Sequence, residues 1–171
     1  MLVNCHCHIF SLACVPRDFR RRFFLDLRDP VQRFVHGQVA RLLPDESFLE
    51  GWWELTDLDI AGIARRLLAE MDEAGVDLCT PLMMDMAHCE GWGGDVMPYG
   101  RQIEETAEAV EAINRESGRV RMVPFVAADP RREDHLDLVR RALEEGPFGG
   151  VKIYPVMGFT PDDPRLAPLY E

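Results

Sequence analysis

Residues 57–84 read DLDIAGIARRLLAEMDEAGVDLCTPLMM, and this stretch decides the class of fold. Apolar residues recur at helical spacing over residues 57–74, and Gly75 is typical of the position just after a helix. The apolar run 76–84 follows without a linker and has the length of a buried strand. An amphipathic helix that leads straight into an apolar strand is the repeating unit of α/β proteins.

The rest of the chain continues this alternation of helix and strand. Predicted strands lie near residues 2–9, 76–84, 121–128 and 150–154, and predicted helices cover residues 57–74, 101–117 and 133–145. The first of these helices has Thr56 and Asp57 as candidate N-terminal caps. Residues 11–56 contain aromatic clusters but no clear strand, so we predict an insertion of short helices and loops after the first strand.

Continuously apolar strands that alternate with amphipathic helices indicate a parallel sheet with both faces covered. No predicted strand is followed by the glycine-rich loop with which doubly wound folds bind nucleotide phosphates, which makes a (β/α) barrel the better frame. We therefore predict the α/β class and a single domain over residues 1–171, in which four parallel strands with helices outside form half of a (β/α)8 TIM barrel.

Composition excludes several kinds of partner and compartment. The chain is 47% hydrophobic and 29% charged, as in soluble globular proteins. Its net charge of −11 argues against nucleic acid or an anionic membrane surface as a partner. Five cysteines, an odd number without Cys-x-x-Cys spacing, suit a reducing compartment, and residues 1–16 lack a cationic leader. We expect a cytoplasmic protein.

The first predicted strand carries a His-x-His motif. His6 and His8 lie two residues apart, so a regular strand places both imidazoles on one face, where they can bind zinc or a similar metal. Cys5 and Cys7 alternate to the opposite face and are excluded from the same site. The alternative is a pair of solvated histidines on a surface strand.

Lys152, in the fourth predicted strand, is the only lysine of this chain. All other basic residues are arginines, so this position indicates a need for an amine that can lose its proton. It could act as a general base, form a Schiff base, or form a carbamate that offers oxygens to a metal. The alternative is chance in a composition rich in arginine.

Four further polar residues are weaker candidates. Asp85 and His88 follow the second predicted strand and are as consistent with hydrogen bonding in a loop as with a site. His36, in the insertion, and His135, early in a helix, are interpreted as structural or solvated.

Four motifs together resemble the amidohydrolase superfamily, specifically the amidohydrolase-related (amidohydrolase 2) TIM-barrel metal-dependent hydrolases. They are His6-Cys7-His8, Pro81-Leu82-Met83-Met84-Asp85-Met86, Pro124-Phe125-Val126-Ala127-Ala128-Asp129-Pro130 and Gly150-Val151-Lys152-Ile153-Tyr154-Pro155. The resemblance implies that His6 and His8 bind a divalent metal, usually zinc, which activates a water for attack on an amide, ester or lactone carbon of a small-molecule substrate. It also implies that Lys152 is a metal ligand at a position where some members carry a carboxylated lysine.

The resemblance leaves alternatives open. Some members of the superfamily decarboxylate their substrates, and the superfamily's later histidines and aspartate have no counterpart in a chain that ends soon after its fourth strand. We therefore expect either a homo-oligomer or a missing C-terminal half, because four strands alone leave bare edges. A non-catalytic half-barrel that assembles with itself or with a partner is the other interpretation.

Overall fold

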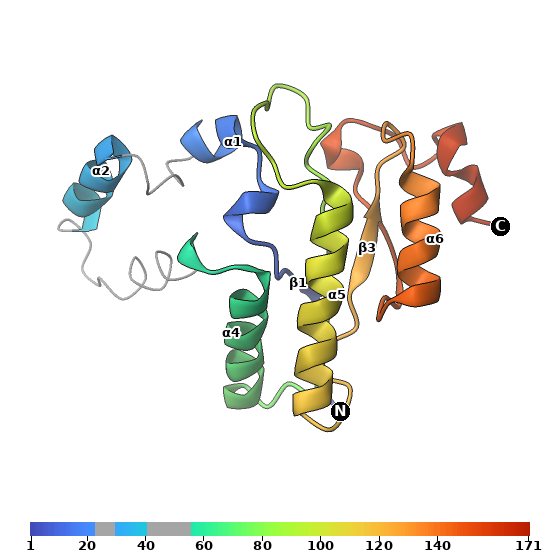
Figure 1. The fold of residues 1–171 in the computed structure, drawn as a ribbon, viewed down its shortest axis with the longest axis horizontal. Coiled ribbons are helices and arrows are strands. Elements are labelled where there is room, and N and C mark those ends of the chain that lie inside the picture. Colours follow the sequence, from blue (N-terminus) through green and yellow to red (C-terminus); the bar gives the residue numbers. More distant parts are fainter. Residues whose placement is uncertain (23–29, 41–55) are drawn as a thin grey trace.

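The computed structural model describes residues 1–22, 30–40 and 56–171 (Figure 1). In chain order its elements are β1 (Val3–Cys7), η1 (Leu12–Cys14), α1 (Arg17–Arg22), α2 (Pro30–Ala40), α4 (Ile60–Glu73), β2 (Leu78–Pro81), α5 (Tyr99–Glu116), β3 (Phe125–Ala128), α6 (His135–Glu145), β4 (Gly150–Ile153), η2 (Pro155–Met157) and η3 (Pro164–Leu169). The first three helical elements, η1, α1 and α2, lie in the predicted insertion, where residues 23–29 and 41–55 fall outside the described residues.

The three predicted amphipathic helices are confirmed, with shifted ends. Helix α4 begins at Ile60 because the Asp59 carboxylate accepts a hydrogen bond from the Gly62 N–H at 2.7 Å, so Asp59 is the cap in place of the expected Thr56 or Asp57. The same helix ends just before Gly75, whose φ of 68° few residues other than glycine adopt readily.

The strands are shorter than predicted and pair differently. Strand β1 pairs with β2 in parallel, and β3 pairs with β4 in parallel, as two separate two-stranded sheets. The prediction of four strands in one sheet, and with it half of a (β/α)8 barrel, is therefore wrong, although the chain is a mixed α/β protein. Between the two sheets only isolated parallel bridges occur, Cys79 with Met122 and Leu82 with Phe125.

Pro81 gives a physical reason for this interruption. The Cys79 N–H donates to the Arg121 carbonyl at 2.9 Å, and the Val123 N–H donates to the Cys79 carbonyl at 3.0 Å. The next donor along β2 would be residue 81, but proline has no N–H, so a continuous ladder stops there. The sheet pairing resumes only at Met83, whose N–H donates to the Phe125 carbonyl at 3.0 Å.

Helix α5 packs against both sheets and joins them. Its Val110 and Ile113 belong to an apolar cluster with α4 and the first sheet, whereas its Ile103 belongs to a second cluster with α6 and the second sheet. Figure 1 shows α5 standing between α4 and α6. A buried Tyr99 at the start of α5 donates its hydroxyl to the Ala127 carbonyl at 2.9 Å and accepts the Ala127 N–H at 2.8 Å.

Among the residues that the structure describes, no helix combines the length and the apolar character needed to cross a lipid bilayer.

Candidate functional site

The two histidines of the His-x-His motif are neighbours at the end of β1. His6 lies within the strand and is exposed, whereas His8 follows its last residue and is half-buried. Their ring centroids lie 5.2 Å apart, with the planes at 84°. The motif thus brings two imidazoles side by side, as the spacing predicts.

A backbone contact decides which nitrogen of His8 carries its proton. His8 Nδ1 lies 2.7 Å from the carbonyl oxygen of Leu82, just beyond β2. Because a carbonyl oxygen only accepts, Nδ1–H is the donor, and the lone pair of the neutral ring is on Nε2. Burial lowers the pKa of His8, the Leu82 carbonyl opposes this shift, and the charges of Lys152 and His6 lower the pKa further. Burial and the two positive charges outweigh the carbonyl and favour the neutral ring, which is the form that binds metals.

Lys152 lies in β4 and is electrostatically linked to His8. Its Nζ lies over the Tyr154 ring, 4.3 Å from the centroid, a cation–π contact on a half-buried side chain. Burial lowers the pKa of Lys152, and its charge lowers the pKa of His8. The charges of His6, in the first sheet, and of Lys152, in the second sheet, thus both act on the His8 ring.

Cys5 and Cys7, the two cysteines next to the motif, have surroundings that differ from those of the histidines. Cys5 is exposed, and Cys7 packs against the buried cluster that contains Cys79. A hydrogen bond from Cys79 lowers the pKa of the Cys7 thiol, and the same contact, together with burial, raises the pKa of Cys79. Cys7 therefore interacts with the core between the strands and helices, and not with the histidine pair.

The two neighbouring imidazoles are chemically suited to a divalent metal as part of an open coordination shell. Within residues 1–22, 30–40 and 56–171, no group of three or more histidine, cysteine, aspartate or glutamate side chains could hold a metal ion. A metal held by this pair would have coordination positions left for other ligands.

Asp85 is fully engaged by an arginine that the sequence did not single out. The Arg132 guanidinium donates from Nε to Asp85 Oδ2 at 2.5 Å and from a second nitrogen to Oδ1 at 3.1 Å, with both side chains largely buried. Arg132 also lies over the Tyr99 ring, 5.3 Å from its centroid. Asp85 therefore has a structural role that ties the end of β2 to the loop before α6.

A second aspartate at the same end of the fold is paired in the same manner. Burial would raise the pKa of Asp129, but hydrogen bonds from Arg131 outweigh it and lower the pKa, helped by the charge of His88. The charge of His88 therefore acts on Asp129 and is not among the causes that lower the pKa of His8. His135 is structural, since its ring nitrogens face the carbonyls of Arg132 and Arg165 at 2.6 and 3.1 Å.

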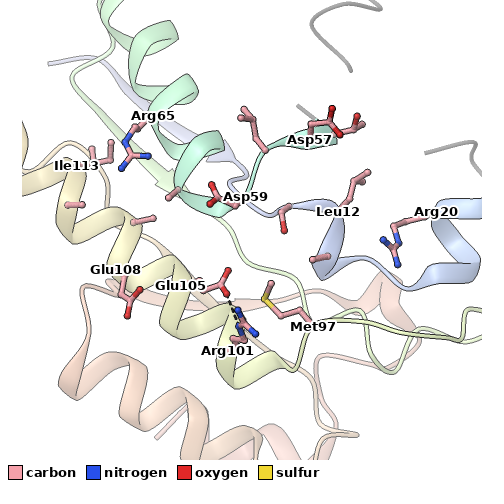
Figure 2. A pocket seen from close by; sticks show the side chains of 17 residues that line it. Leu12, Arg20, Asp57, Asp59, Arg65, Met97, Arg101, Glu105, Glu108 and Ile113 are labelled. Atoms are coloured by element: carbon pink, nitrogen blue, oxygen red, sulfur yellow. Dashed lines mark hydrogen bonds and ion pairs between the residues drawn. The ribbon is translucent and has the colours of Figure 1, made fainter. Parts of the chain in front are cut away.

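Two cavities lie beside these elements. His8 lines an apolar cavity of about 500 Å³. A larger one of about 660 Å³, between η1, the start of α4 and α5, is lined by charged side chains that include the Arg101–Glu105 ion pair at 2.8 Å (Figure 2). None of His6, His8 and Lys152 lines the charged cavity, whereas His8 lines the apolar one.

Sequence reasoning missed three contributors to the site. The Leu82 carbonyl could not be found because any residue type supplies it. Tyr154 stands two residues from Lys152, and i, i+2 spacing on a strand was the signal that could have paired them. The ring of Phe10 lies 5.5 Å from that of His8, again at i, i+2.

No family model, no curated protein and no solved structure matches this chain.

Proposed function

We propose that this chain is a metal-dependent hydrolase of the amidohydrolase type, in which His6, His8 and Lys152 bind a divalent metal, with zinc as the first candidate. The observation that carries the proposal is the 2.7 Å hydrogen bond from His8 Nδ1–H to the Leu82 carbonyl. Histidine ligands of metals commonly donate their other ring N–H in this way, which orients the ring and sets its tautomer.

Each residue has a distinct part in the proposed site. A bound metal would supply Lewis-acid activation of a water for attack on an amide, ester or lactone carbon. His8 presents Nε2 in a fixed direction, and His6 supplies the neighbouring imidazole. Lys152 offers an amine whose pKa is lowered by burial, so it loses its proton more readily than an exposed lysine and can act as a ligand or as a base.

The proposed substrate is a small molecule, and the proposed compartment is the cytoplasm. The odd number of cysteines supports a reducing compartment, and all five are free thiols in the structure.

Zinc titration of the chelator-treated protein tests the proposal. We expect one zinc per chain by calorimetry and elemental analysis. His6→Ala and His8→Ala should each weaken the affinity at least about tenfold, because each removes a ligand and leaves an incomplete shell. Hydrolysis of a panel of simple amides, esters and lactones should be lost on chelation and return with zinc.

His88→Ala is the matched control, because His88 acts on Asp129 and not on the histidine pair. Its zinc affinity should equal that of the original chain. If no zinc, manganese or iron binds stoichiometrically, or if His8→Ala binds as tightly as His88→Ala, the proposal is wrong.

A further inference from the structure

An apolar cavity of about 500 Å³ opens beside His8, between the end of the first sheet, η1, α1 and α4. This volume lies within the range of roughly 300–1,000 Å³ found for small-molecule sites. Its wall is mostly aromatic, aliphatic and thioether side chains, among them Phe10, Phe19, Leu67, Met84 and Met86. The cavity is therefore large enough for a small organic molecule and offers it an apolar surface.

The charged groups of the lining compensate one another. Arg66 and Glu70, on successive turns of α4, are joined by a 3.1 Å ion pair and are exposed to solvent. A charged ligand would lose hydration on entering this wall without gaining a charge of opposite sign. His8 adds a polar group to the lining, with its Nδ1–H already donated to Leu82.

The apolar wall and the candidate site share one packed cluster. Met86 and Val15 form its buried part with Met157, and Phe10, Phe19, Met84 and Tyr154 pack against them, the last of these lying under Lys152. Phe19 is held in an edge-to-face contact with Trp92, with centroids 5.1 Å apart. Methionine sulfurs and aromatic edges make favourable contacts with aromatic ligands.

We propose that this cavity binds the body of the substrate, and that this body is an uncharged aromatic or similarly apolar group whose scissile amide, ester or lactone lies toward His8. The assignment rests on the proposed hydrolase function, since His8 serves in it as a metal ligand. It adds that substrates with a charged body are poor ligands.

A matched pair of fluorescent probes tests the assignment in metal-free protein. N-phenyl-1-naphthylamine is uncharged, and 8-anilinonaphthalene-1-sulfonate has the same rings with an added sulfonate. We expect the uncharged probe to saturate at one molecule per chain and to bind at least about tenfold more tightly than the sulfonate. Its binding should shift the ring NMR signals of His8 and leave those of His135 in place.

Two variants separate the cavity from general surface adsorption. Met84→Gln keeps the side-chain length but places an amide in the wall, and should weaken the uncharged probe at least about tenfold. Leu143→Gln, at a 40% exposed position of α6 outside the cavity, should not change it. Non-saturating binding, equal affinity in both variants or a preference for the sulfonate would overturn the assignment.

The outcomes also distinguish this assignment from the metal proposal. If zinc binds but the uncharged probe does not, the apolar substrate site is wrong and the metal proposal stands. If the probe saturates and Met84→Gln weakens it while zinc does not bind, the apolar site is supported and only the metal-dependent chemistry is wrong.

Discussion

At the scale of single residues, the protonation state of His8 is the property that depends most on its surroundings. Its position two residues after His6 is a property of the sequence, but its protonation is decided by partial burial and by a carbonyl 74 positions further along the chain. Burial disfavours the charged imidazolium, and the positive charges of Lys152 and His6 disfavour it further. The fold therefore favours the neutral ring with its lone pair on Nε2, which is the form that the proposed metal binding requires.

This environment predicts a particular pH dependence. Because the pKa of His8 is lowered in the folded state, the unfolded chain takes up this proton first as the pH falls. The stability that His8 contributes is complete above its ordinary pKa of about 6.5 and is lost as the pH falls through the lower folded-state value. An NMR titration of the histidine rings should give a midpoint for His8 below 6.5, with the proton of the neutral ring on Nδ1.

Replacement of this side chain provides the control. In His8→Gln, the part of the stability loss between pH 7.5 and 5 that comes from this ring should disappear in urea unfolding, whereas His88→Gln should retain it. A His8 midpoint at or above the ordinary value, or a neutral ring protonated on Nε2, would contradict the described geometry.

At the scale of elements, the pairing of β3 with β4 depends on glycine. Gly150 lies opposite Phe125 in the parallel register, and a Cβ at residue 150 would lie 2.8 Å from the Phe125 ring. Gly149 is equally constrained, because a Cβ there would clash with the Val123 side chain. The Gly-Gly pair thus lets the start of β4 approach β3 closely, which sequence patterns alone do not predict.

Gly150→Ala should therefore destabilise the fold by about 1–3 kcal/mol, the usual cost of adding a group where no space exists. Gly100→Ala is the matched control in α5, because its Cβ would make only an ordinary 3.8 Å contact with Leu138, and it should be neutral or stabilising by up to about 1 kcal/mol. Urea unfolding of both variants measures the difference. Equal stability of the two variants would show that the close approach of Gly150 to Phe125 does not affect the free energy of unfolding.

At the scale of the whole molecule, two small sheets replace the single sheet that the sequence predicts. The order of helices and strands was predictable, because apolar periodicity and the glycines at residues 75 and 146 mark the ends of elements locally. The number of strands per sheet was not, because it depends on whether β2 and β3 form a continuous ladder. Pro81 was visible in the sequence, but its effect requires knowing that its missing N–H would face β3.

The free edges of these sheets predict self-association. Among the described strands, β1 and β4 each pair on one side only, and two-stranded sheets are marginal without further pairing or packing. We expect light scattering to give a mass above the 19.5 kDa of one chain at micromolar concentration. Because each copy carries a net charge of −11, association should strengthen as salt screens the repulsion. A mass of one chain at all salt and protein concentrations would contradict this expectation.

The sequence by itself determined the α/β alternation, the two neighbouring imidazoles and the presence of a single lysine. Helical and strand periodicity and residue chemistry are local properties of the chain. Only the tertiary structure decided the division into two sheets, the tautomer of His8 and the apolar cavity next to His8. Most of these features arise where segments far apart in the chain meet, and their geometry follows from packing and backbone hydrogen bonds that no local pattern encodes.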